Sequence, residues 1–133
     1  MPRDVLYLDS SALVKLVLEE AESEALRLYL MSRAQRVSSI VAGVEVRRAA
    51  RREGGKRGAD RASDVLDGVY LIELDAPIVE LAAALSPGSL RTLDAIHLAS
   101  ALSLGGDLGP LVTYDLRLRR AGEAAGLEIA APS

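Results

Sequence analysis

Four acidic residues stand at positions from which side chains can carry chemistry. Each lies where an apolar, strand-like run ends or where a helical pattern begins: Asp9, Glu45, Asp94 and Asp115. Asp9 closes the apolar run 5–8, and Asp115 closes the run 111–114. Carboxylates that gather at one edge of a parallel sheet repel one another unless a cation lies among them. The pattern therefore predicts a divalent-metal site.

The available donor atoms indicate which metal and which reaction. The chain has no Cys and one His, so the donors are oxygens, which favours Mg²⁺ or Mn²⁺ over Zn²⁺. Such an ion lowers the pKa of a bound water and stabilises charge on a phosphoryl oxygen. The reaction indicated is hydrolysis of a phosphodiester. A metal-activated water needs no histidine base, so we expect His97 to be structural.

Each acid also has an ordinary structural explanation. Asp9 and Asp115 could cap the helices that follow them. Asp94 could favour the start of its helix through the helix dipole. Glu45 could pair with an arginine on its own helix surface. Each explanation is adequate for one residue, but the four acids taken together favour a common site.

Strand-like and helical patterns alternate along the chain and would position these acids. Strands are expected at 5–9, 37–41, 69–74, 111–114 and 127–130. Helices are expected at 11–19, 22–34, 42–53, 57–67, from 76 onward, 92–104 and 116–125. This alternation predicts an α/β protein with a parallel sheet and helices on both faces. A strand order 3-2-1-4-5 would place Asp9 and Asp115 at the switch point where such sheets bind ligands.

Length and composition limit the kinds of protein that this chain can be. The 133 residues, about half of them apolar, are expected to form one domain, 1–133. The absence of Cys excludes disulfides and thiolate metal sites. The N-terminus shows no signal-peptide pattern, and no apolar run approaches the roughly 20 residues of a membrane span. We therefore expect a cytoplasmic protein that makes no contact with a membrane.

Positive charge is concentrated in two segments although the net charge is −3. Seven cations lie between Arg47 and Arg61, and a second group follows Asp115. An arginine-rich helix is either a solvated surface or a site of bidentate phosphate contacts. On the second interpretation, the expected contacts to a nucleic-acid backbone are Arg47, Arg48, Arg51 and Arg117.

Four segments of the chain resemble the PIN domain, and more narrowly the VapC toxins of bacterial and archaeal toxin–antitoxin pairs. These segments are 8–15, 39–46, 93–101 and 112–118, and they occur in the order of the family. The resemblance implies a three-layer α/β/α sandwich and an Mg²⁺- or Mn²⁺-dependent endoribonuclease. It implies catalytic roles for the four acids: Asp9, Asp94 and Asp115 would hold the metal, and Glu45 would act through water or position the nucleophile. Ser11 and Thr113 match hydroxyl residues that hold water or orient a carboxylate.

The resemblance also implies partners. A VapB-type antitoxin is expected to neutralise the toxin, RNA is the expected substrate, and homodimers are common in the family. An antitoxin segment would lie in a groove formed by apolar residues of the first two helices: Leu13, Leu16, Val17, Leu26 and Leu30.

Two questions stay open at the level of sequence. Many relatives carry an additional Asp or Asn beside the last acid, where this chain has Tyr114 and Leu116, so one or two metals are both compatible. The same departure would suit a catalytically inactive PIN-like binding module. A phosphoryl-accepting signalling domain would need a Lys at the end of a late strand, but the only lysines are Lys15 and Lys56.

Overall fold

The computed structural model describes residues 3–33 and 35–133 and shows a five-stranded parallel sheet in the order β3-β2-β1-β4-β5. The strands are β1 (Val5–Leu8), β2 (Gln35–Ser39), β3 (Tyr70–Ile72), β4 (Leu108–Val112) and β5 (Ile129–Ala130). The helices are α1 (Ser10–Val17), α2 (Ser23–Leu30), α3 (Ile40–Asp67), α4 (Ala76–Ala84), α5 (Thr92–Leu102) and α6 (Leu116–Ala124), with a 3₁₀ turn at Gly105–Asp107. The predicted fold class and strand order are confirmed.

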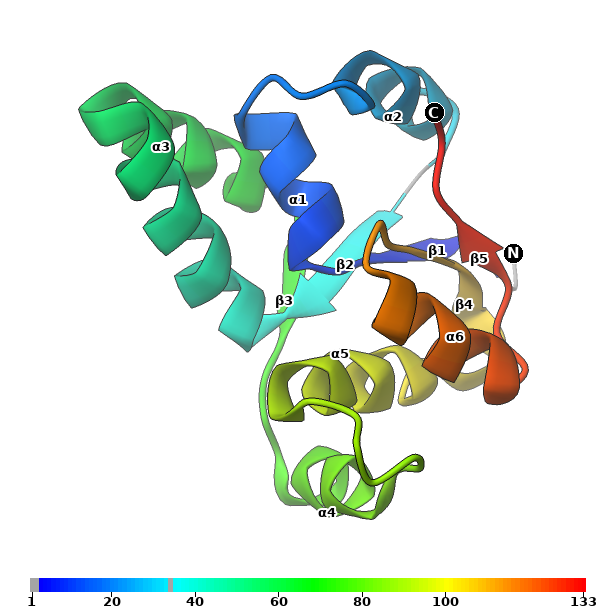
Figure 1. Cartoon of the computed structure of the whole chain (residues 1–133). Coiled ribbons are helices and arrows are strands. Elements are labelled where there is room, and N and C mark those ends of the chain that lie inside the picture. Colours follow the sequence, from blue (N-terminus) through cyan, green and yellow to red (C-terminus); the bar gives the residue numbers. More distant parts are fainter. Residues whose placement is uncertain (1–2, 34) are drawn as a thin grey trace.

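Alternation along the central strand explains the three layers. Leu6 and Leu8 of β1 pack into one core cluster with residues of α1, α2 and α3. Val5 and Tyr7 point the opposite way and pack with residues of α5 and α6. Because successive side chains of a strand point to opposite faces, four consecutive buried residues require helices on both sides. Figure 1 shows this arrangement, with α1, α2 and α3 on one side of the sheet and α4, α5 and α6 on the other.

Two strands differ from the expected boundaries. β2 begins and ends two residues before the predicted 37–41, because Ser39 caps α3 through a hydrogen bond from the Val41 N–H to its Oγ (3.3 Å). β4 begins at Leu108 rather than 111, although it contains Gly109 and Pro110, which suggested a loop. Proline is tolerated here because the pairing of β4 with β1 shifts register beside it. A Cβ at Gly109 would lie 2.4 Å from the Arg3 carbonyl oxygen, so this close approach requires glycine.

The predicted interruption at Gly54-Gly55 is a sharp kink inside α3. Gly55 has φ 59° and ψ −143°, a left-handed conformation that glycine adopts without steric penalty. Two helical arms result, visible as the bent α3 in Figure 1. Arg61, on the second arm, donates to the carbonyl oxygens of Val17 (3.0 Å) and Leu16 (3.2 Å) at the end of α1.

The remaining boundaries agree to within a few residues. α1 starts one residue earlier than expected, because Asp9 is its N-cap. α2 is shorter than the predicted 22–34, and residue 34 lies outside the described residues. In the described part of the chain, no helix is both long and apolar enough to cross a bilayer.

Candidate active site

The four acids come from four separate segments beside the carboxyl ends of β1 and β4. Asp9 links β1 to α1, and Asp115 is the N-cap of α6, which follows β4. The two strands are neighbours, and the Asp9 N–H donates to the Val112 carbonyl oxygen (3.2 Å). Asp94 lies in the first turn of α5 as predicted. Glu45 lies in the second turn of α3, because that helix starts earlier than expected.

Asp9 is the most enclosed of the acids, with 4% of its surface exposed. Its Oδ1 accepts hydrogen bonds from the Ser11 hydroxyl (2.7 Å) and the Ala12 N–H (3.1 Å), and its Oδ2 accepts from the Thr113 hydroxyl (2.7 Å). The structure therefore brings both hydroxyl residues named from the sequence onto this carboxylate. Burial nevertheless raises the pKa of Asp9, although the bonds from Ser11 and Thr113 and the proximity of His97 oppose the rise. A buried acid with an elevated pKa is a common mark of a functional site.

Asp94 and Asp115 extend the acidic region. Partial burial raises the pKa of Asp94, and the negative charges of Asp115 and Asp9 raise it further. Asp115 also caps α6, since its Oδ1 accepts from the Leu118 N–H (3.0 Å). Capping by Asp9 and Asp115 is thus real, but it does not account for the mutual repulsion that Asp94 experiences. The charges of acids from two other segments thus act on Asp94.

Glu45 is held in a different way. Its Oε1 accepts from the Ser10 hydroxyl (2.5 Å) and lies 2.9 Å from Nε2 of His97. Burial opposes the ionised form of Glu45, but the bonds from His97 and Ser10 outweigh it and lower the pKa of this carboxyl. The alternative explanation of Glu45 was a surface pair with Arg48 or Arg52. The structure instead gives a partly buried carboxylate that is hydrogen-bonded from α1 and α5. Glu45 therefore remains ionised beside acids whose pKa values are raised.

The contact between His97 and Glu45 is the feature of the site that sequence reasoning missed. His97 is buried and its Nδ1 lies 2.7 Å from the Tyr7 hydroxyl of β1. The spacing of Asp94 and His97, one helical turn apart, was visible in the sequence. The contact of His97 with Tyr7 was not visible, because Tyr7 lies inside an apolar strand whose residues are expected to be in the core.

The donor set fits a hard cation. In residues 3–33 and 35–133, no three His, Cys, Asp or Glu side chains lie close enough together, as they stand, to hold a metal ion. The neighbouring donors are nevertheless carboxylate and hydroxyl oxygens, which Mg²⁺ and Mn²⁺ prefer. The repulsion that raises the Asp94 pKa is also the kind that a cation relieves. The chemistry of these oxygen donors thus suits Mg²⁺ or Mn²⁺.

A cavity of about 530 Å³ opens beside the acids, between α1 and α3. Glu45 and Asp115 line it together with Arg52, Lys15 and Tyr114. Lys15 is already paired with Glu22 (2.8 Å) and Glu20 (3.2 Å). Arg52 was not among the arginines expected to contact nucleic acid, although it lies seven residues after Glu45 and so on the same helical face.

The four arginines expected to contact nucleic acid lie in different positions relative to the acids. Arg47 donates to the Gly43 carbonyl oxygen of its own helix (3.3 Å), on the side of α3 opposite Glu45. Arg48 and Arg51 are exposed on α3. Arg117 lines a separate cavity of about 600 Å³ between α6 and the loop that joins α4 to α5.

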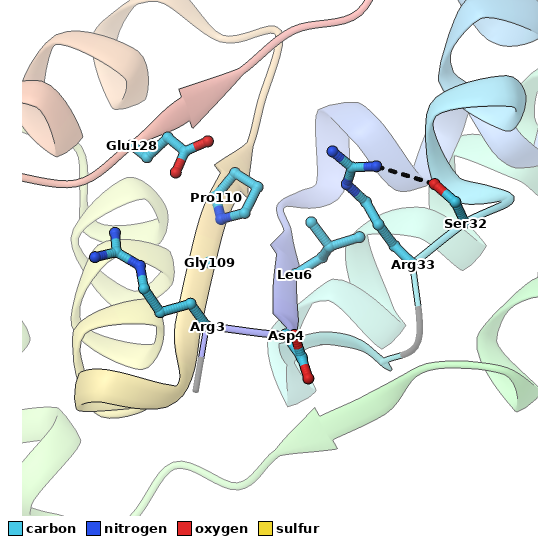
Figure 2. Close-up of a pocket in the computed structure, with 8 residues that line it drawn as sticks. All are labelled: Arg3, Asp4, Leu6, Ser32, Arg33, Gly109, Pro110 and Glu128. Carbon is cyan, nitrogen blue, oxygen red and sulfur yellow. Dashed lines mark hydrogen bonds between the residues drawn. The ribbon is translucent and has the colours of Figure 1, made fainter. Parts of the chain in front are cut away.

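Another pocket, also about 530 Å³, lies at the opposite edge of the sheet (Figure 2). Residues before β1 and β2 and from the first half of β4 line it, including Arg3, Arg33 and Gly109. The Arg33 guanidinium turns toward the Ser32 hydroxyl (3.2 Å) and lies over the Tyr29 ring. None of the four acids lies there, so this pocket is separate from the candidate active site.

The residues expected to form an antitoxin groove lie in the core instead. All five are buried beneath α1 and α2: Leu13, Leu16, Val17, Leu26 and Leu30. Their helical spacing reflects packing against the sheet, which is the usual role of such a stripe. Large apolar side chains that are exposed here are Leu28 of α2 and Met31, which follows the helix as its C-cap. The structure therefore corrects the placement of the groove.

Comparison with known proteins gives a consistent result. A model of the PIN domain matches residues 6–124. Ribonuclease VapC46 of Mycobacterium tuberculosis is 50% identical over 130 residues, which is 96% of this chain and 98% of that protein. The crystal structure of Mycobacterium tuberculosis VapC20, titled a sarcin-ricin loop cleaving toxin, is similar in fold, with a TM-score of 0.76, 19% identity, and coverage of 96% of this chain and 99% of that one.

A toxin–antitoxin complex from Klebsiella pneumoniae contains a chain of the same fold. Its TM-score is 0.71 at 22% identity, with coverage of 96% of this chain and 98% of that one. At these identities the two solved structures establish the fold, whereas the family model and the 50% identical relative establish descent. The chain therefore belongs to the PIN domain family, and within it to the VapC proteins.

Proposed function

We propose that the chain, as one PIN-like domain over residues 1–133, is an Mg²⁺- or Mn²⁺-dependent endoribonuclease toxin that hydrolyses RNA phosphodiester bonds. The observation that carries the proposal is that Asp94, partly buried in the first turn of α5, lies within the field of two further acids from other segments, Asp115 and Asp9. Repulsion between carboxylates destabilises a folded protein, and a cation bound among them would remove this cost. The name of the 50% identical relative, a ribonuclease, supports RNA as the substrate class.

In this mechanism the residues divide by what they hold. Asp9, Asp94 and Asp115 would bind the cation, which when bound would activate water and neutralise charge on the phosphoryl group. Ser11 and Thr113 fix the orientation of Asp9 through their hydrogen bonds, as groups behind a metal ligand commonly do. Glu45 stays ionised and can accept a proton or a hydrogen bond from the attacking water.

We propose that exposed arginines guide the RNA backbone into the cavity between α1 and α3. Arg52 lines that cavity with Glu45 and Asp115, which makes it the strongest candidate. Arg48 also lies near the Glu45 face of α3, while Arg51 and Arg117 remain candidates from their exposure. Backbone contacts of this kind supply affinity without sequence information.

Replacing Arg52 with glutamine is expected to weaken RNA binding several-fold and to lower the salt dependence of binding, by a slope of about 0.7 for one lost single-strand phosphate contact. Arg47→Gln is the matched comparison, because Arg47 is on the opposite side of the same helix. Titrations of a labelled RNA at several salt concentrations measure both quantities. Equal losses in the two variants would show that the cavity does not direct the RNA.

We also propose a VapB-type antitoxin as partner, a cytoplasmic location and a homodimeric state. A chain of this fold occurs in the Klebsiella pneumoniae toxin–antitoxin complex. The antitoxin contact cannot use the five buried leucine and valine residues without opening the core. Exposed apolar side chains near them, such as Leu28 of α2 and Met31 at its C-cap, are better placed for it.

The function is tested by mapping cleavage sites on total RNA with the purified protein in Mg²⁺. We expect new 5′ ends at a small number of positions, since proteins recognise RNA mostly at single-stranded loops, bulges and ends and by its shape. Asp9→Ala serves as the inactive control, and addition of the product of the neighbouring gene should suppress the cleavage. Absence of any new ends with metal-saturated protein would instead support a binding module without catalysis.

A further inference from the structure

His97 is almost completely enclosed, with 2% of its surface exposed, and it connects the sheet with the candidate active site. Its Nδ1 lies 2.7 Å from the Tyr7 hydroxyl, and its Nε2 lies 2.9 Å from Oε1 of Glu45. The Tyr7 and His97 rings meet edge to face, with centroids 5.8 Å apart and an interplanar angle of 77°. One imidazole therefore joins β1, α5 and α3.

The hydrogen bonds define the direction of this connection. An ionised carboxylate only accepts, so the nitrogen facing Glu45 must carry a hydrogen. Ser10 gives its own hydrogen to Glu45 Oε1 and so can accept from Nε2, which lies 3.2 Å from its Oγ. In the neutral imidazole Nδ1 is then an acceptor, and the Tyr7 hydroxyl donates to it. A tyrosine hydroxyl is ordinarily protonated at neutral pH, so Tyr7 can donate to Nδ1 over the 2.7 Å between them.

Two donors thus meet at one oxygen of Glu45. Oε1 receives hydrogen bonds from Ser10 and His97, which come from α1 and α5. A glutamate side chain is flexible, and holding one oxygen from two sides fixes the direction of the other. Displacement of a reacting group by about 1 Å costs on the order of a hundredfold in rate. A fixed Glu45 is therefore a sufficient physical reason for the buried hydrogen bonds of Tyr7 and His97.

We propose that His97 is a positioning residue for Glu45, oriented in turn by the hydroxyl of Tyr7. The inference rests on the proposed ribonuclease function, because it assigns the relay Tyr7–His97–Glu45 to that reaction. Its role is to set the tautomer and the orientation of the imidazole, so that Nε2–H always faces Oε1. His97 itself does not touch the RNA in this account.

Two amide substitutions separate positioning from packing. The amide group of Gln ends at the ε position and can replace Nε2–H, whereas that of Asn ends at the δ position and can only replace Nδ1. We expect His97→Asn to lower kcat by about tenfold to a hundredfold, the range seen for groups that orient site residues. KM should change little, and His97→Gln should retain more activity than His97→Asn. A purely structural histidine would instead lose activity in proportion to the fall in thermal stability.

The ring nitrogens supply a readout that does not depend on activity. Because the chain has one histidine, ¹⁵N spectra of the imidazole contain a single pair of ring signals. We expect the pattern of the Nε2-protonated tautomer in the wild-type protein. Tyr7→Phe, which keeps the ring and removes the hydroxyl, should shift this pattern and lower kcat several-fold. Tyr29→Phe is the matched control, since Tyr29 lies on α2 beside Arg33, away from the relay, and it should change neither.

The outcomes distinguish this inference from the proposed function. If the wild-type protein cleaves no RNA in the presence of metal, the proposed function fails. If the wild-type protein cleaves RNA and Asp94→Asn does not, but folded His97→Asn matches the wild-type kcat, only the positioning role is overturned. An imidazole protonated on Nδ1 alone would overturn it as well. If His97→Asn does not fold, the kcat values of Tyr7→Phe and His97→Gln are compared with the wild-type value instead.

Discussion

Asp94→Asn is expected to reduce RNA cleavage by at least about a hundredfold without lowering thermal stability. The loss follows from removal of a charge that would bind the cation, a contribution of several kcal/mol to the transition state. The retained stability follows from the electrostatics of the folded protein. Burial and the charges of Asp115 and Asp9 raise the pKa of Asp94, so its ionised form is disfavoured in the native state. A neutral amide removes that penalty.

The direction of the pH dependence can be derived from the same shift. A carboxyl whose folded pKa is raised stabilises the native state while it is protonated, and this contribution is lost as the pH rises through the folded pKa. In metal-free buffer the melting temperature of Asp94→Asn, relative to wild type, should therefore increase from acidic to neutral pH. Asp64→Asn, on an exposed part of α3, is the control and should show no such trend. If Asp94→Asn melts well below the wild-type protein at neutral pH, the proposed repulsion between Asp94 and the neighbouring acids is wrong.

Removal of divalent metal is expected to abolish cleavage, and Mg²⁺ or Mn²⁺ should restore it. The same ions should raise the melting temperature of the wild-type protein, because a ligand that binds only the native state stabilises it by about 2.7 kcal/mol at a hundred times its dissociation constant. Asp94→Asn should lose most of this stabilisation, since Asp94 is one of the three acids proposed to hold the ion. Cleavage assays and thermal melts over a metal titration measure the two effects.

Asp64→Asn again provides the matched control, because it removes one exposed carboxylate outside the site. It should keep both the activity and the stabilisation by metal. Full cleavage in excess chelator would refute the metal mechanism. Stabilisation by metal without cleavage would favour the alternative of a PIN-like binding module.

Local sequence signals identified the acids and much of the framework that carries them. Asp9 and Asp115 follow apolar runs that predict strands, and Asp94 lies in the first turn of a well-patterned helix. Gly54-Gly55 predicted the interruption that appears as the kink of α3. These features are encoded within a few neighbouring residues, by burial, capping and glycine conformation, and so can be read without the fold.

Features that depend on contacts between distant segments were misjudged. The five residues expected to form a groove are apolar at helical spacing, and this pattern is the same for an exposed groove and for a face that packs on the sheet. Only the tertiary structure shows that these side chains face the core. β4 includes Gly109 and Pro110 because its neighbours accommodate them through a register shift and a close backbone approach, which no local pattern announces. Arg52 shares a helical face with Glu45, but the cavity that makes this face important requires α1.

The sequence by itself thus determined which acidic residues lie at the ends of strands and the starts of helices, because neighbouring residues are enough to predict those positions. Only the tertiary structure decided which of them act on one another. It placed Asp94 within the field of Asp9 and Asp115. It also bound Glu45 to His97 and, through the imidazole, to Tyr7. The physical reason is that electrostatic coupling and hydrogen bonding depend on distances in space, and those distances exist only once the sheet has brought residues 7, 45 and 97 together.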